Sequence, residues 1–337
     1  MTSTGMDVEL YTAESLGERN IIRIIWEQLS KAPGMSVPFG DDVSAIEFNE
    51  HDLVVKTDML VGRTDVPAGM SYSQAARKAV VMNVSDFASK GAKPLGLVVS
   101  LGIPRSLTQK EIKRIGKGLN DGAREYEAYV LGGDTNETSD LIISVAIFGV
   151  PGNANLTLRD GAQPGDILAT TGPFGLTSSG LRMLKEKLPT PTKIKKKLAD
   201  SVLMPHARLK EGLALAKIGA ATASIDSSDG LAWSLHEISR ASNVGFIIDN
   251  PPIANEAREF AKLHNLDPLE LSLYGGEEYE LILTIKPSCW REAREAVIRE
   301  GGDLIRIGET VANKTLLIKQ KSKLVKIEAR GYEHFKN

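Results

Sequence analysis

Aspartates in apolar or glycine-rich surroundings recur along this chain of 337 residues. Five segments contain them, "FGDDVSAI", "VKTDMLV", "MNVSDFAS", "LGGDTNET" and "SIDSSDGL", and these supply Asp41, Asp42, Asp58, Asp86, Asp134, Asp226 and Asp229. Each acid ends an apolar strand-like run or interrupts an apolar helix-like run. An ionised carboxylate in such surroundings is costly unless another group compensates its charge.

A divalent cation is the compensating group that these residue types favour. A single "SDG" or "GDD" is more typical of a turn, but five such places suggest convergence. Converging carboxylates would otherwise drive their own protonation. Hard oxygen ligands beside Ser and Thr hydroxyls, without His or Cys, select Mg²⁺, which usually also holds substrate phosphates. The pattern predicts a phosphate-handling enzyme with several Mg²⁺ ions, one of which compensates Asp58.

The known nucleotide-binding signatures do not occur in the sequence. It has no GxxxxGK[ST] loop, no GxGxxG fingerprint, and no HRD or DFG kinase segment. We therefore expect a nucleotide to be held through its metal ions, through the glycine backbone of "LGGDT", and by a cation such as Arg159.

The elements that must position these acids follow from hydrophobic periodicity. It predicts helices at 15–31, 71–92, 108–126, 176–187, 193–200, 208–217, 230–242 and 254–264, with strands at 43–48, 52–61, 95–101, 128–131, 141–149, 166–171, 222–226 and 244–248. The turn-rich segment 151–166 is the expected boundary between an N-terminal ATP- and Mg-binding domain, 1–150, and a C-terminal domain, 151–337, that completes the active site. Consecutive strands in each half favour an α+β fold with two domains.

Composition restricts the class of protein further. With 42% hydrophobic and 25% charged residues, the chain is typical of soluble globular proteins. A net charge of −2 argues against a nucleic-acid partner and against a membrane surface. One cysteine and five scattered histidines argue against disulfides and zinc. The N-terminal segment lacks signal-peptide character and no apolar run could span a bilayer, so we expect a cytoplasmic protein.

Eight motifs, taken in order, resemble the thiamine-monophosphate kinase family. They are "GDD", "KTDMLV", "NVSDFASKGAKP", "LGGDT", "LRDGAQPGD", "TGPFG", "IDSSDGL" and "YGGEEYEL". The resemblance runs from about residue 14 to the "GYEHF" of 331–335, and "VGRTDVP" is most similar to the archaeal branch. It implies a homodimer in which N-terminal strands of two subunits form a β-barrel, with a C-terminal α/β half packed against it.

The resemblance also implies an activity: ATP phosphorylates thiamine monophosphate to thiamine diphosphate by direct in-line transfer of the γ-phosphoryl group. By motif, the expected magnesium ligands are Asp42, Thr57, Asp58, Asp86, Asp134, Asp226 and Asp229. The expected ATP contacts are Gly133, Asp134, Arg159 and Ser228, and those to thiamine monophosphate are Asp65, Glu277 and Tyr332. No catalytic general base is expected, because the acceptor phosphate is already anionic.

The sequence departs from the family pattern at three places. Lys56 stands where many members have Ser or Thr, Asp65 replaces the usual His, and "GGEEYEL" replaces "GGEDYEL". An acid at position 65 could pair with the cationic thiazolium of the substrate. Two alternatives stay open: another ATP-dependent enzyme of the superfamily that acts on a different acceptor, and a nucleotide-binding homologue without turnover. Reactive cysteines typical of selenide-activating and hydrogenase-maturation relatives are absent from both ends of the sequence.

Overall fold

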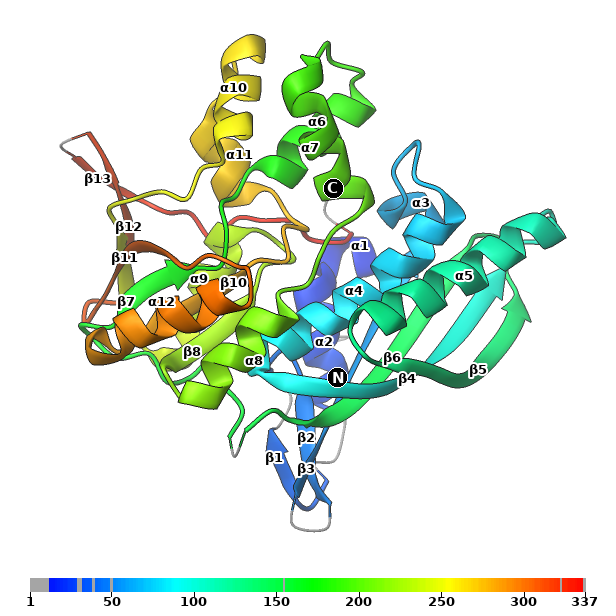
Figure 1. Cartoon of the computed structure of the whole chain (residues 1–337), viewed down its shortest axis with the longest axis horizontal. Coiled ribbons are helices and arrows are strands. Elements are labelled where there is room, and N and C mark those ends of the chain that lie inside the picture. The colour runs from blue at the N-terminus through cyan, green and yellow to red at the C-terminus, as the bar shows by residue number, and fades with distance from the viewer. Residues whose placement is uncertain are drawn as a thin grey trace, which may run out of the picture.

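The computed structural model describes residues 12–28, 32–37, 40–48, 51–153, 155–321 and 323–335. It is a two-domain α/β fold with two mixed sheets (Figure 1). The strands of the first sheet are β1 Met35–Val37, β2 Ser44–Phe48, β3 His51–Val61, β4 Ala92–Ile103, β5 Tyr129–Glu137 and β6 Ile142–Pro151. Their order is β1-β2-β3-β6-β4-β5, and β4 and β5 run parallel. Neither sheet closes into a barrel within the described ranges.

The second sheet belongs to the C-terminal half. Its strands are β7 Ile167–Thr170, β8 Ala221–Asp226, β9 Gly245–Ile248, β10 Leu281–Ile285, β11 Ile305–Val311, β12 Leu316–Gln320 and β13 Lys323–Lys326. Their order is β13-β12-β9-β11-β7-β10-β8, with β9 and β12 parallel. Strand β8, which ends at Asp226, is one of the two edge strands of this sheet.

The helices pack partly on these sheets and partly on one another. They are α1 Ala13–Leu16, α2 Glu18–Trp26, α3 Gly62–Asp65, α4 Tyr72–Lys90, α5 Gln109–Glu125, α6 Leu176–Lys185, α7 Thr192–Leu203, α8 Leu209–Ile218, α9 Leu231–Ser242, α10 Asn255–His264, α11 Pro268–Tyr274 and α12 Trp290–Arg299, with a 3₁₀ turn at Pro287–Cys289. Among the described residues, no helix combines the length and the apolar character that a bilayer span requires.

Helix α4 joins the two halves. A capping box of Ser71 and Gln74 starts it, and Gly91 ends it in the left-handed conformation (φ 65°). The helix packs on β3, β4 and β6 of one sheet and on α8 and β8 of the other domain. A side chain at Gly212 of α8 would lie 2.0 Å from the Ala88 carbonyl oxygen, so the two helices approach closely. The predicted helix at 71–92 is confirmed. Because most of this helix is buried, a carboxylate on it requires a compensating partner.

The predicted first helix, 15–31, is wrong in extent. Gly17, with φ 72°, separates α1 from α2. The predicted residues 29–31 lie outside the described part of the chain, as does the N-terminal segment 1–11. Helix α11 was not predicted, although Asp267 caps it and Pro268 occupies its first turn.

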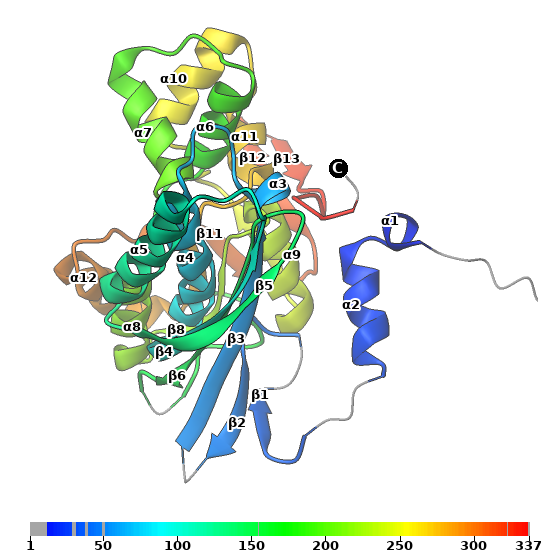
Figure 2. The same cartoon turned by 90° about the vertical axis from the view of Figure 1, so that its right-hand side faces the viewer.

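The first sheet has a covered face and an open face. Figure 2 shows α4 and α5 on one side of its strands. On β3, Val54 and Leu60 are buried in the core that includes α4, whereas Val55 and Met59 are exposed. The exposed large apolar side chains of this sheet include Phe48, Val55, Met59, Leu95, Val98 and Leu131. We call the face that carries Val55 and Met59 the outer face.

Candidate functional site

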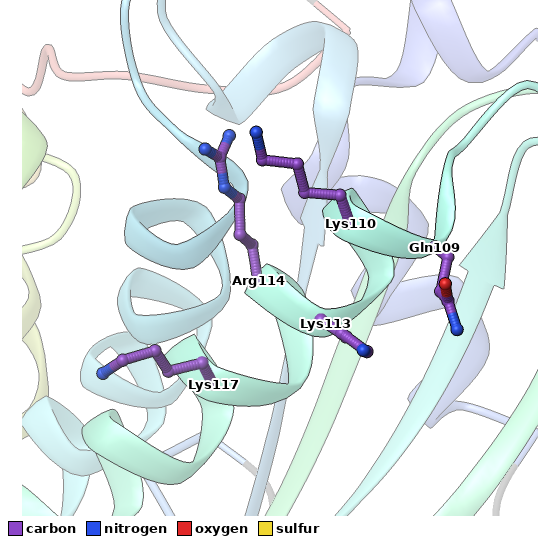
Figure 3. A pocket seen from close by; sticks show the side chains of 5 residues that line it. All are labelled: Gln109, Lys110, Lys113, Arg114 and Lys117. Atoms are coloured by element: carbon purple, nitrogen blue, oxygen red, sulfur yellow. The ribbon is translucent and has the colours of Figure 1, made fainter.

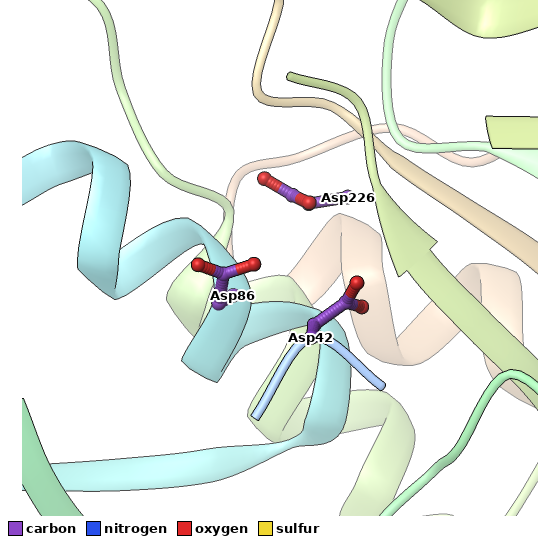
Figure 4. A group of neighbouring side chains, drawn as sticks. All are labelled: Asp42, Asp86 and Asp226. Atoms are coloured by element: carbon purple, nitrogen blue, oxygen red, sulfur yellow. The ribbon is translucent and has the colours of Figure 1, made fainter. Parts of the chain in front are cut away.

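Three buried aspartates meet between the two domains. They are Asp42 from the segment between β1 and β2, Asp86 from α4, and Asp226 from the end of β8 (Figure 4). One carboxylate oxygen of each lies within 4.8 Å of the others. The tertiary structure therefore brings together acids that the sequence predicted from three separate motifs. We call them the acid cluster.

Two cations neutralise the Asp42 end of the acid cluster. The Lys90 Nζ lies 2.8 Å from a carboxylate oxygen of Asp41 and 2.8 Å from one of Asp42. The Arg159 Nε donates to Asp42 at 2.9 Å, and Ser89 Oγ donates to it at 2.8 Å. Burial alone would raise the pKa of Asp42, but the guanidinium of Arg159 and the ammonium of Lys90 hold it below its usual value. Sequence reasoning missed Lys90, whose partners lie far from it in the sequence.

A third cation lies at the other end of the acid cluster. Lys56 and Asp58 are two residues apart on β3, so both side chains face α4. The Lys56 Nζ lies 3.3 Å from Asp58 and 2.9 Å from Asp86. Burial would lower the pKa of Lys56, but Asp58 and Asp86 raise it. A protein ammonium thus compensates Asp58, where the sequence analysis expected magnesium.

Carboxyl groups outnumber cations at this site. Burial, with Asp42 nearby, raises the pKa of Asp226 to about 7, although Ser85 Oγ donates to its carboxylate at 2.6 Å. Burial and the neighbouring acids also raise the pKa of Asp86 despite Lys56. Within the described residues, the carboxylates of Asp41, Asp42, Asp58, Asp86 and Asp226 face the cations Lys56, Lys90 and Arg159. A buried set of oxygen ligands with more carboxyl groups than cations fits a Mg²⁺ ion.

Two predicted ligands lie away from the acid cluster. Thr57 precedes Asp58 on β3, so its side chain lies on the outer face, where its hydroxyl donates to the Val145 carbonyl at 2.9 Å. Asp134 of β5 is paired with Ser100 of β4. Ser100 is paired with Ser144 of β6, and Ser144 with Met59 of β3. Three strand spacings correspond to about 14 Å. One chain therefore does not bring Asp134 or the Thr57 hydroxyl to the cluster.

Gly133 has a structural reason to be glycine. A Cβ at this position would lie 1.9 Å from the Val99 carbonyl oxygen of β4, whereas one at Gly132 would meet nothing within 4 Å. The close approach of β4 and β5 thus requires Gly133, whatever it contacts in addition.

The two C-terminal motif loops are joined by backbone hydrogen bonds. Glu277 N–H donates to Ser228 O at 2.6 Å, and Tyr279 N–H donates to Ser227 O at 3.0 Å. A Cβ at Gly276 would lie 2.5 Å from Ser228 O, so this contact requires glycine. Glu277 and Tyr279 both have positive φ, 62° and 54°. Such backbone strain in residues with side chains concentrates at functional sites.

Residues of the Ser228 loop remain accessible. Ser228 is exposed, and Asp229 pairs with Arg19 of α2 at 3.3 Å. Burial raises the pKa of Asp229 to about 6, although Arg19 opposes the shift. The guanidinium of Arg19 also lies over the Trp233 ring, 3.3 Å from its centroid. Sequence reasoning missed Arg19, because nothing local marks it.

The three residues assigned to the substrate lie near one another. Lys78, whose side chain is 1% exposed, bridges the Glu277 carboxylate at 2.5 Å and the Asp65 carbonyl at 2.9 Å. Tyr332 N–H donates to Asp229 O at 3.0 Å. Burial raises the pKa of Tyr332, and the negative charges of Asp65 and Glu277 raise it further. Burial raises the pKa of Tyr279, and the negative charges of Glu277 and Asp226 raise it further.

A separate hollow lies along α5. Its lining consists of Gln109, Lys110, Lys113, Arg114 and Lys117 (Figure 3). None of the predicted site residues belongs to it, and its lysines are solvated surface side chains.

Comparison with known proteins decides the family. The chain matches the family models "AIR synthase related protein, N-terminal domain" over residues 40–151 and "AIR synthase related protein, C-terminal domain" over residues 163–319. It is 37% identical to the thiamine-monophosphate kinase of Pyrococcus horikoshii, across 95% of this chain and 96% of that protein. The chain belongs to the thiamine-monophosphate kinase family. The thiamine-monophosphate kinase of Bacillus subtilis is 30% identical across 95% of this chain and 100% of its own length.

Solved structures of the thiamine-monophosphate kinase family have the same fold. AaThiL complexed with AMPPCP and TMP superposes with a TM-score of 0.83 at 26% identity, over 98% of this chain and 100% of that one. The hydrogenase maturation protein HypE of E. coli has a TM-score of 0.70 at 19% identity, over 93% of this chain and 97% of that one. At that identity it shares the fold alone.

Proposed function

We propose that this protein transfers the γ-phosphoryl group of ATP to thiamine monophosphate, yielding ADP and thiamine diphosphate. The observation that supports it most is the acid cluster, which lies between the two domains. Relatives along almost the whole chain are thiamine-monophosphate kinases, one of them described with an ATP analogue and TMP.

Each part of the site has a role in this reaction. Asp42, Asp86 and Asp226 would hold Mg²⁺, which would supply charge neutralisation to the phosphates. Asp58 contributes to the same site through its ion pair with Lys56, and Asp229 is proposed as a further ligand from the loop that follows Asp226. Ser228 and Arg159 contact ATP, and Gly133, which lies three strands from β3 like Asp134, contacts it across the proposed dimer. The acceptor phosphate is a monoester anion, so the protein supplies position and positive charge, and no side chain is needed as a general base.

The substrate end of the site has the chemistry to bind a cationic aromatic group. Asp65 and Glu277 supply carboxylates, and Tyr332 supplies a ring that is 40% exposed. The thiazolium ring of thiamine is cationic, so it is attracted both by carboxylates and by an aromatic face. We propose that these three residues bind the thiamine moiety.

Asp65→Asn should raise the KM for thiamine monophosphate by about 10-fold and leave the KM for ATP unchanged, because it removes one charge from the thiazolium site. The amide oxygen of Asn still accepts the hydrogen bond that Asp65 takes from Val61 N–H at 2.7 Å. Steady-state kinetics with each substrate varied measure both constants. Asp140→Asn is the matched control, because Asp140 accepts from Arg63 N–H in the same α3 corner. Equal KM values for the wild type and Asp65→Asn would exclude this role.

We further propose that a second copy packs on the outer face and forms the inter-subunit barrel. The outer face exposes Val55, Met59 and Val98, and β5 has one edge without a strand partner in the described chain. Large exposed apolar faces and open edges favour association. Because Thr57 and Asp134 are both on outer-face rows, an isologous dimer brings Asp134 of one copy toward Thr57 of the other.

Each sheet belongs to one of the two proposed domains. Residues 1–150 form the ATP- and Mg-binding domain, and 151–337 form the domain that completes the active site with Asp226, Ser228 and Glu277. Since the reaction consumes ATP, we place the enzyme in the cytoplasm.

The activity is tested by incubating the purified protein with ATP, MgCl₂ and thiamine monophosphate, and by quantifying ADP and thiamine diphosphate together. We expect equal amounts of both products and no ADP when thiamine replaces thiamine monophosphate. Binding of ATP without either product would contradict the proposal and favour a different acceptor or a protein without turnover.

A further inference from the structure

Lys56 occupies an unusual place for a lysine. Its ammonium lies between Asp58 and Asp86, at 3.3 Å and 2.9 Å, and its side chain is 22% exposed. Both partners are fixed, because Asp58 shares a strand face with Lys56 and Asp86 belongs to the buried helix α4. The Asp58 backbone is also held in place, since its N–H donates to Asn83 at 2.9 Å.

The ammonium and a divalent ion cannot share this position. A protonated lysine donates three hydrogen bonds and offers no lone pair to a metal. An ion that bridged Asp58 and Asp86 would lie within a few ångströms of the ammonium, and like charges at that range repel strongly in a buried site. Either Lys56 or a divalent ion therefore connects these two carboxylates.

We propose that the ammonium of Lys56 is a built-in cation that takes the place of one divalent ion between Asp58 and Asp86. This inference rests on the proposed function, since it concerns the cations that neutralise the phosphates. A chain with Ser at this position would lack the +1 charge of the ammonium, and the two freed carboxylates could hold one more divalent ion. Asp42, Asp86 and Asp226 would hold the remaining ions.

Manganese binding tests this inference without turnover. Free Mn²⁺ is measured by electron paramagnetic resonance while the folded protein is titrated in the presence of AMPPCP. Lys56→Ser should bind about one more Mn²⁺ per chain than the wild type, because the vacated carboxylates are free to ligate an ion. Lys56→Arg keeps the charge and should bind the same number as the wild type. Lys110→Ser on the exposed side of α5 is the control for loss of one lysine.

Equal Mn²⁺ counts for folded Lys56→Ser and the wild type would overturn the proposal. If Lys56→Ser folds only when Mn²⁺ is present, the proposal is supported, because the ion then replaces the ammonium. Crystals of the wild type grown with Mn²⁺ and AMPPCP give an independent result. Anomalous peaks near Asp42 and Asp226, with Lys56 still paired to Asp58 and Asp86, are expected. A peak ligated by Asp58 and Asp86 together, with Lys56 displaced, would overturn the proposal even if the enzyme is active.

Discussion

Asp226→Asn should lower kcat by at least about 100-fold while the protein remains folded. Asp226 joins the two domains at the acid cluster, and burial with the charge of Asp42 outweighs the stabilisation that Ser85 and Lys56 give its carboxylate. A neutral amide binds Mg²⁺ more weakly than a carboxylate does, so the ion that neutralises the phosphates is lost. Quantifying ADP and thiamine diphosphate at saturating substrates measures kcat, and circular dichroism verifies folding. A variant with more than about a tenth of the wild-type kcat would remove Asp226 from the mechanism.

The same substitution should stabilise the protein when divalent ions are removed by a chelator. The pKa of Asp226 is about 7 in the folded protein, above its value in the unfolded chain. The folded state therefore binds more protons between about pH 4 and pH 7, and the free energy of unfolding falls as pH rises through this range. In Asp226→Asn this fall should be smaller, with a gain of about 1 to 3 kcal/mol at pH 7.5. Thermal unfolding at pH 5.5, 6.5 and 7.5 measures it.

Asp166→Asn is the matched control for both measurements. Asp166 is a buried acid of the same domain, but it accepts hydrogen bonds from Gln163 N–H at 2.9 Å and from Thr222 Oγ1 at 2.6 Å. It is not part of the acid cluster, so its replacement should reduce stability and preserve kcat. The opposite signs of the two variants separate a functional acid from a structural one.

Asp134→Asn should lower activity by at least about 10-fold, and a heterodimer should recover it. Asp134 lies about 14 Å from β3 in its own chain, and the proposed dimer places it on the outer face of the partner's β3, beside Thr57 and one residue from Asp58. A heterodimer of Asp134→Asn and Asp226→Asn then contains one intact site, formed by the two unaltered acids. Co-expression with two affinity tags and tandem purification should yield about half of the wild-type activity per dimer.

Two results would contradict this arrangement. An inactive heterodimer would place Asp134 and Asp226 in the same site of one chain, since each of the two sites would then have one altered acid. Failure to recover any heterodimer by tandem purification, with a wild type that elutes as a monomer in light scattering, would exclude the dimer.

The main elements follow from local sequence. Helix α4 begins at the capping box of Ser71 and Gln74 and ends at Gly91, and all three signals are visible within 71–92. The acid cluster is also predicted, because a carboxylate in an apolar run stands out by its energetic cost. Asp42, Asp86 and Asp226 each have such a context.

Strand register was not available from the sequence. Motif order placed Thr57, Asp58 and Asp134 in one metal site, but β-strands alternate their side chains between faces. Thr57 thus lies on the face opposite to Asp58, and Asp134 is three strands away. A one-residue change in pairing would exchange these faces, and only the folded sheet determines it.

The sequence by itself determined the family, the acids and the positions of the long helices and strands, because each depends on nearby residues. Only the tertiary structure decided how the acids are compensated. Lys90 reaches Asp42, Arg159 reaches Asp42 from 117 residues away, and Lys56 joins Asp58 to Asp86. Ion pairs between distant segments depend on how two sheets and α4 pack. In a buried site, that packing fixes which charges meet and which remain for a metal ion.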